Sequence, residues 1–176
     1  MTAPSAWIRR FAGDVAAGAS VLDVACGGGR HSLLFRDQGA AVTAIDRDIS
    51  AIAGLKEIEI IAADLETGAP WPLGGRRFDC VVVTNYLWRP ILPDILAAVG
   101  DGGLLLYETF AAGNEAFGRP SRPEFLLRPG ELLEITRDAF EVRAYEHGYG
   151  DSPSPGVRQR ISALRTGPGS ATACTT

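Results

Sequence analysis

The chain has 176 residues, of which 46% are hydrophobic and 22% are charged, and its formal net charge is −4 at pH 7. This length and composition predict one globular domain with a well-buried core and leave no room for two large domains. The acidic balance provides no basic surface to attract the phosphates of nucleic acid, so we expect no nucleic-acid partner.

The three cysteines, Cys26, Cys80 and Cys174, form no Cys-x-x-Cys pair, and only two histidines accompany them. Their spacing favours neither a disulfide framework nor a structural zinc site, and we expect no bound metal. No stretch reaches the length of a membrane span, and the N-terminal residues lack the apolar core of a signal peptide. The sequence therefore predicts a soluble, cytoplasmic protein that does not bind a membrane.

Apolar residues at helical spacing predict a first helix over residues 5–17. A buried strand, a turn of three glycines at residues 27–29 and a helix that ends near Gln38 follow directly. Glycine is needed in such a turn because a side chain would clash at positive φ or hold a ligand away from the backbone. Further strands are predicted over residues 40–46, 59–63, 78–84 and 104–108, with short helices over residues 49–55 and 90–99.

The C-terminal third begins with a polar, glycine- and proline-rich segment over residues 109–123, typical of an active-site loop. A short turn and a helix over residues 130–136 come next. Residues 141–146 and 158–164 are predicted to form an antiparallel hairpin at the sheet edge. The domain is expected to span residues 1–165, and the composition of residues 166–176 predicts a disordered tail.

This order predicts an α/β fold: a doubly wound, Rossmann-like sheet, mostly parallel with a C-terminal antiparallel hairpin strand and with helices on both faces. Ligands of such sheets lie beyond the carboxyl ends of the strands. A polar residue closes each predicted parallel strand. These closing positions are Asp23 before the glycine turn, Asp46, Asp64, the pair Asn85 and Tyr86, and Glu108.

Asp46 lies about 20 residues after the glycine turn, where a carboxylate can accept hydrogen bonds from both hydroxyls of a ribose. The spacing therefore predicts a nucleoside site. The dinucleotide fingerprint requires a third glycine at position 32, where this chain has Ser32. An NAD(P)-dependent oxidoreductase is consequently the alternative rather than the main hypothesis.

The motif VLDVACGGGR over residues 21–30, followed by Asp46, by ADL at residues 63–65, by Asn85 and by the glycine pair before the fifth strand, resembles the successive motifs of class I S-adenosylmethionine-dependent methyltransferases. The form Cys-Gly-x-Gly-Arg, the small size and the segment from Gly118 to Glu131 are similar to the tellurite-resistance methyltransferase-like branch.

The resemblance implies S-adenosylmethionine as cofactor and a role for each matching position. Residues of the glycine turn would surround the methionine portion, and Asp46 would hold the ribose beside Arg47. Asp64 and Leu65 would meet the adenine, and Asn85 and Tyr86 would lie beside the sulfonium. The implied cofactor-binding residues are Asp23, Cys26, Gly27, Gly29, Arg30, Asp46, Arg47, Asp64, Leu65, Asn85 and Tyr86.

Methyl transfer from a sulfonium is an in-line displacement that mainly requires alignment and a water-excluding cavity. A general base is needed only for an acceptor that starts protonated, and the candidates for a catalytic role are Tyr86, His31 and Glu108. Candidates for the acceptor site are Trp88, Phe110, Arg119 and Arg122.

We expect a methyltransferase that acts on a small molecule as a monomer or homodimer. A non-catalytic S-adenosylmethionine-binding module remains a second alternative. The stretch Asn85-Tyr86-Leu87-Trp88 lacks the Asn-Pro-Pro-Tyr motif of enzymes that methylate amino groups of bases or glutamine, which argues against base N-methylation.

Overall fold

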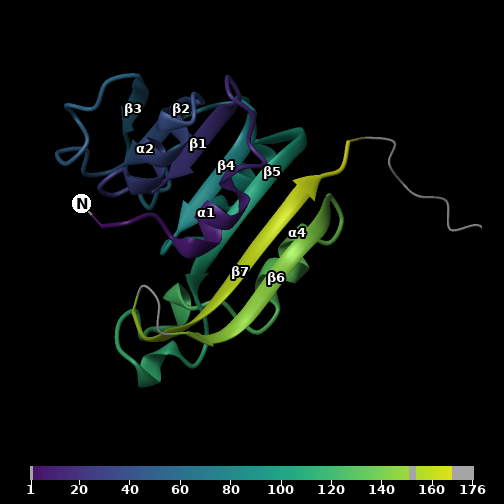
Figure 1. Cartoon of the computed structure of the whole chain (residues 1–176). Coiled ribbons are helices and arrows are strands. Elements are labelled where there is room, and N and C mark those ends of the chain that lie inside the picture. Colours follow the sequence, from purple (N-terminus) through teal and green to yellow (C-terminus); the bar gives the residue numbers. More distant parts are fainter. Residues whose placement is uncertain (1, 151–153, 168–176) are drawn as a thin grey trace, which may run out of the picture.

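The computed structural model describes residues 2–150 and 154–167, so most of the predicted tail lies outside the described residues. The chain forms one seven-stranded sheet with the order β3-β2-β1-β4-β5-β7-β6 (Figure 1). The strands are β1 (Ser20–Val24), β2 (Ala41–Asp46), β3 (Ile58–Ala62), β4 (Phe78–Thr84), β5 (Val99–Phe110), β6 (Phe140–Gly150) and β7 (Gly156–Arg165). The helices are α1 (Ala6–Ala12), α2 (Arg30–Asp37), α3 (Leu92–Ala97) and α4 (Glu131–Thr136), with 3₁₀ turns η1 (Arg89–Ile91), η2 (Asn114–Ala116) and η3 (Pro123–Phe125).

The first five strands run parallel, and the β6–β7 hairpin joins the edge of β5 antiparallel. The predicted Rossmann-like architecture with a C-terminal antiparallel hairpin is therefore confirmed. The chain order reverses at β1, which pairs with β2 on one side and β4 on the other. A crevice forms at such a reversal because the connections leave the two strands in opposite directions.

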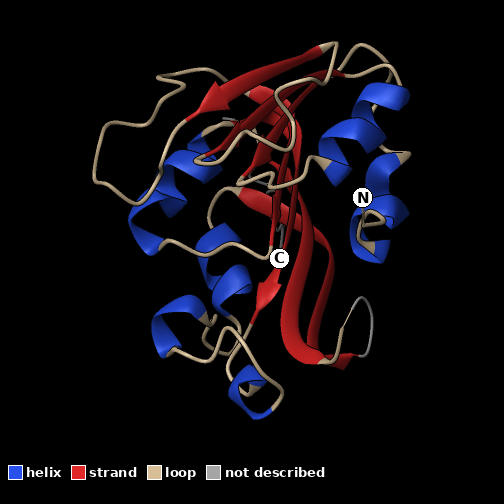
Figure 2. Cartoon of the chain, turned by 90° about the vertical axis from the view of Figure 1, so that its left-hand side faces the viewer, coloured by secondary structure: helices blue, strands red, loops and turns tan. Residues whose placement is uncertain are grey.

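Helices cover both faces of the sheet, as expected (Figure 2). Helices α1 and α2 pack on one face, where Trp7 and Phe35 share a buried cluster with Val21. Helices α3 and α4 pack on the other face against a cluster that includes Leu22. Neighbouring residues of β1 thus serve opposite faces, because side chains alternate along a strand. Both faces are apolar, which explains the uninterrupted hydrophobic runs of the parallel strands.

The helix predicted over residues 49–55 is wrong, because the structure contains only turns there. Asp48 Oδ1 accepts a hydrogen bond from Ser50 N at 3.0 Å, and the Ala53 amide bonds to Ile49 O, which closes a single helical turn. Gly54 lowers the helix propensity of the segment. The Asp48 side chain also competes with helical hydrogen bonding, because it holds the Ser50 amide in a turn.

Other boundaries also differ from the prediction. Helix α1 stops at Ala12 instead of residue 17, and the helix expected over residues 90–99 is divided into η1 and α3. Strand β5 begins at Val99, five residues early, and therefore includes the glycine pair that was predicted as a turn. A Cβ at Gly103 would lie 2.9 Å from Phe78 O, so only glycine permits this close approach of β5 to β4.

None of the helices in residues 2–150 and 154–167 is long and apolar enough to cross a membrane, and α2, at eight residues, is the longest of them.

Candidate active site

The glycine turn between β1 and α2 is built from residues in the left-handed conformation, including Ala25 at φ 52°, Gly27 at φ 54° and Gly29 at φ 71°. A Cβ at Gly29 would lie 2.8 Å from Ile52 Cγ2, so this glycine lets the turn pack against the residues that follow β2. A Cβ at Gly27 would meet open space. That space belongs to a cavity of about 390 Å³, lined by Thr2, Ala25, Cys26, Gly27, Gly28, Arg30, Thr84 and Asn85.

Asp23 is buried near the end of β1, two residues before Ala25, which lines this cavity. Its Oδ2 accepts a hydrogen bond from Ser32 Oγ at 2.6 Å, and its Oδ1 has no partner among the described residues. Burial raises the pKa of Asp23 from 3.8 to about 6, against the hydrogen bonds from Ser32 that lower it. From the sequence, Ser32 was noted only as a departure from the third glycine of the dinucleotide fingerprint. In the structure, this serine positions the Asp23 carboxylate.

Asp46 closes β2, and two backbone amides hold its carboxylate. Gly27 N donates to Oδ2 at 2.8 Å and Asp48 N donates to Oδ1 at 3.0 Å. The carboxylate thereby connects the glycine turn to the end of the next strand. It faces a cleft of about 460 Å³, lined by Asp46, Arg47, Ala63, Asp64, Leu65, Glu66, Tyr86 and Phe125.

Asn85 and Tyr86 stand between the two hollows. Asn85 has a left-handed φ of 53°, and its backbone N–H donates a hydrogen bond to Glu108 O at 2.9 Å. Asn85 lines the cavity of the glycine turn, whereas Tyr86 lines the cleft beside Asp46. Burial raises the pKa of the Tyr86 hydroxyl, which keeps its proton and has no hydrogen-bond partner among the described residues. The hydroxyl oxygen is itself buried, so its hydrogen-bonding capacity is unused within the described chain.

His31 and Glu108, the other two catalytic candidates, are engaged in holding the N-terminal segment. His31 Nε2 accepts from Ser5 N at 3.1 Å, and its Nδ1 lies 3.3 Å from Thr84 Oγ1. Burial and the charge of Arg30 lower the pKa of His31 to about 3, so the ring is neutral at pH 7. Glu108 accepts from Ser5 Oγ at 3.0 Å and from Arg160 Nε at 2.6 Å. These contacts favour a structural role for both side chains over that of a general base.

The acceptor candidates divide into two groups. Arg119 and Arg122 line a third cavity of about 570 Å³, together with Phe125, which also lines the Asp46 cleft. Trp88 and Phe110 line neither of these two hollows. Trp88 instead precedes η1, and the Arg158 guanidinium lies 4.3 Å from the centre of the Phe110 ring.

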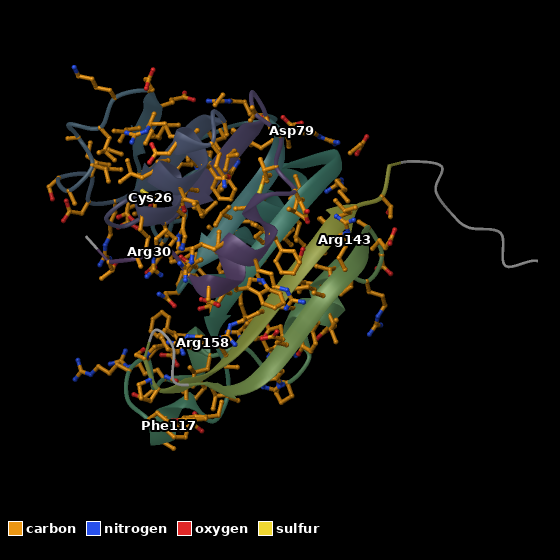
Figure 3. The ribbon with its side chains drawn as sticks, in the orientation of Figure 1. Cys26, Arg30, Asp79, Phe117, Arg143 and Arg158 are labelled. Atoms are coloured by element: carbon orange, nitrogen blue, oxygen red, sulfur yellow. The ribbon has the colours of Figure 1, made fainter. Side chains whose placement is uncertain are left out.

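The hollows lie at the carboxyl end of the parallel strands. Figure 3 labels Cys26 and Arg30 at this end, whereas Asp79, at the start of β4, lies at the opposite end of the sheet. Arg30 Nη1 donates to Ala3 O at 3.4 Å, which ties the N-terminal segment to the glycine turn. Within the described ranges, no group of three or more His, Cys, Asp or Glu side chains is arranged to hold a metal ion.

The profile of a methyltransferase domain family matches residues 2–148. The chain belongs to this family. It is 34% identical over 106 residues to a malonyl-[acyl-carrier protein] O-methyltransferase of Pseudescherichia vulneris; the match spans 54% of the chain and 41% of that relative. The matched part of the chain thus spans less than half the length of this curated relative.

Solved structures share the fold at low sequence identity. TehB from Haemophilus influenzae superimposes with a TM-score of 0.74 at 22% identity, covering 95% of this chain and 64% of that one. A 1,6-didemethyltoxoflavin-N1-methyltransferase of Burkholderia thailandensis, solved with S-adenosylhomocysteine, has a TM-score of 0.66 at 19% identity and covers 92% of this chain and 79% of that one. The resemblance to class I S-adenosylmethionine-dependent methyltransferases, and with it the predicted cofactor, is confirmed.

Proposed function

We propose that this methyltransferase domain transfers the methyl group of S-adenosylmethionine to a small-molecule acceptor by in-line displacement. The observation that carries the proposal is the arrangement of the strand ends. Gly27 lines one hollow and Asp46 lines another, the Asp46 carboxylate accepts from Gly27 N, and the buried, unpartnered Asp23 oxygen lies near the end of the same β1 strand.

The residues present fit the cofactor. The unpartnered Asp23 Oδ1 suits the ammonium of its amino-acid end, which the backbone of Gly27 and Gly29 can approach, with Cys26 and Arg30 beside it. Asp46 suits the ribose hydroxyls. Arg47, Asp64 and Leu65 line the adenine side of the cleft. S-Adenosylmethionine, when bound, supplies a methyl group activated by the positive sulfur: the acceptor's lone pair forms the new bond to the methyl carbon, and the electron pair of the broken carbon–sulfur bond stays on sulfur.

The chain's contribution to the chemistry is alignment and exclusion of water. Asn85 borders the cavity of the glycine turn and Tyr86 borders the Asp46 cleft, and the two residues would orient the acceptor atom between them. Because His31 and Glu108 are occupied by Ser5, the acceptor is expected to bring its own lone pair as a thiolate, an unprotonated amine or an oxyanion. Its proton, where present, passes to solvent.

The names of the relatives support a small or tethered acceptor, since one acts on 1,6-didemethyltoxoflavin and another on a malonyl group carried by acyl-carrier protein. The net charge of −4 argues against a nucleic-acid substrate. We place the domain in the cytoplasm as a monomer or homodimer, in keeping with the free thiols of Cys26 and Cys80. Light scattering after size-exclusion chromatography tests the oligomeric state.

Calorimetry with S-adenosylmethionine, S-adenosylhomocysteine and NAD tests the cofactor site. The two sulfur nucleosides are expected to bind and NAD is not. Tight NAD binding without any response to either nucleoside would overturn the proposal in favour of an oxidoreductase. Release of S-adenosylhomocysteine, measured across thiols, acids, amines and metalloid oxyanions, then separates an enzyme from a binding module, because a module binds the cofactor without turnover.

A further inference from the structure

Arg119 and Arg122 lie on the segment between β5 and α4 and line the cavity that adjoins the cofactor cleft through Phe125. Both side chains are exposed to this cavity and to solvent. Only uncharged residues accompany them in its lining, namely Pro120, Ser121 and Phe125. The cavity therefore combines two positive charges with one aromatic wall.

Neither arginine forms an ion pair or a side-chain hydrogen bond with any residue of the described chain. The two acidic residues closest in sequence, Glu115 and Glu124, do not pair with these arginines. The Glu115 carboxylate accepts a hydrogen bond from Gly113 N at 2.8 Å. Glu124 accepts a hydrogen bond from Arg89 through its backbone oxygen. Other arginines of this region are paired, such as Arg160 with Glu108 and Arg89 with Glu131.

The backbone that carries the two arginines is nevertheless firmly held. The buried Asn114 side chain donates to Pro120 O at 2.8 Å and accepts from Val157 N at 3.2 Å. On the far side of Arg122, the Arg89 guanidinium donates to Glu124 O and to Leu126 O at 2.7 and 2.8 Å. The stretch from Pro120 to Leu126 is thus fixed to β7 through Asn114 at one end and to η1 through Arg89 at the other. The Arg119 and Arg122 side chains make no contribution to these contacts.

Two unpaired guanidinium groups on a fixed backbone are suited to an anion, because charge-assisted hydrogen bonds from arginine match the oxygens of a carboxylate or phosphate. We propose that the methyl acceptor carries an oxyanion group, bound by Arg119 and Arg122, and that the remainder of the molecule passes Phe125 to reach Tyr86. This inference rests on the proposed function, since it takes the adjoining cleft as the cofactor site.

The test uses nuclear magnetic resonance of the arginine Nε–H groups in the full chain loaded with S-adenosylhomocysteine. Succinate is titrated as the carboxylate probe, inorganic phosphate as the phosphate probe and succinamide as the neutral control. Saturable shifts at Arg119 and Arg122 are expected with at least one anion and not with succinamide. Tighter binding of succinate or of phosphate tells which oxyanion class the site takes.

The double variant R119Q/R122Q is expected to weaken anion binding about tenfold, the loss of one charge-assisted pair or more. The matched control R137Q removes another exposed arginine that has no partner in the described chain, and it should bind the anion normally. The inference is overturned if neither anion gives a saturable shift, if succinamide matches them, or if R119Q/R122Q binds as tightly as R137Q. Calorimetry with S-adenosylhomocysteine on the same samples reports separately on the cofactor site, so failure of the two proposals is distinguishable.

Discussion

The carboxyl edge of the sheet has two halves of opposite character. The half that we propose binds the cofactor, called the cofactor half, lies at the ends of β1, β2 and β3. It presents the carboxylates of Asp23, Asp46 and Asp64, which are held by backbone amides and a serine. The half that we propose binds the acceptor, called the acceptor half, is formed by residues 111–127 beside β5 and β7. It presents arginines and is held by Arg89, which pairs with Glu131. A cofactor with an ammonium group and ribose hydroxyls suits the first half, and an anionic acceptor suits the second.

The two halves also differ in what holds their backbone in place. In the cofactor half, the shape comes from backbone conformations such as the left-handed Gly27 and Gly29, so few side chains are needed. In the acceptor half, the irregular segment depends on individual side chains, chiefly Arg89 and Asn114. Substitutions should therefore affect ligand binding most strongly in the first half and folding stability in the second, with Asp23 as the informative exception.

Asp23 gives the largest expected effect. Burial raises its pKa from 3.8 to about 6, so the folded state holds the proton more tightly than the unfolded state. The free energy of unfolding should consequently fall as the pH rises from about 4 to about 6, by up to ~3 kcal/mol. Urea denaturation of wild type and Asp23→Asn over this range measures it, since the variant lacks the titration.

Subtracting the variant from the wild type removes the opposite trend of His31, whose lowered pKa makes stability rise between about pH 3 and pH 6.5. A difference between wild type and variant that stays constant with pH would show that Asp23 titrates normally in the folded chain.

Glu131→Gln tests the support of the acceptor half. Glu131 is only 2% exposed and receives hydrogen bonds from Arg89 Nε at 2.8 Å and from Arg128 N at 2.7 Å. Loss of its charge should lower the free energy of unfolding by about 2 kcal/mol, because the partly buried Arg89 loses its counter-charge. Urea denaturation at pH 7 measures the change.

Glu134→Gln is the matched control, since its pair with Arg128 is more than half exposed on both sides. Its effect should stay within about 0.5 kcal/mol. Equal effects of the two variants would contradict the assignment of Arg89 and Glu131 as the support of the segment.

Asp46→Ala tests the cofactor half directly. It removes the proposed bonds to the ribose and the acceptor for Gly27 N, and should weaken S-adenosylhomocysteine binding by roughly ten- to a hundredfold, about 1.5–3 kcal/mol. Calorimetry provides the measurement. Asp48→Ala serves as control because the Asp48 carboxylate bonds locally to Ser50 and lines neither hollow. A comparable loss in that variant would refute the assigned role of Asp46.

Cys26→Ser should have the smallest effect, less than about threefold on the same affinity. The thiol makes one long contact, 3.9 Å to Gly27 O, and burial raises its pKa to about 12, so it remains an uncharged thiol at pH 7. If the serine variant loses affinity as strongly as Asp46→Ala, the cofactor half relies on this side chain as well as on its backbone.

Local patterns were sufficient for much of the fold. Strand β4 has the predicted bounds, and the sheet topology follows from the alternation of strands and helices. The prediction failed for short elements. Residues 49–55 were predicted as a helix from their apolar spacing, but the turn that begins at Asp48, together with Gly54, prevents a helix there. The start of β5 was missed because Gly103 acts through its close approach to Phe78 O, a contact between strands.

For the candidate site, the sequence by itself determined which residues close the strands, because parallel strands bring their carboxyl ends to one edge wherever they lie along the chain. It did not determine what those residues contact. Only the tertiary structure decided that Ser32 holds Asp23 and that Ser5 occupies His31 and Glu108. It also decided that Arg119 and Arg122 have no partner among residues 2–150 and 154–167. The Ser5–Glu108 contact joins positions 103 residues apart, and hydrogen bonds of this kind depend on how the layers pack rather than on any local pattern of residues.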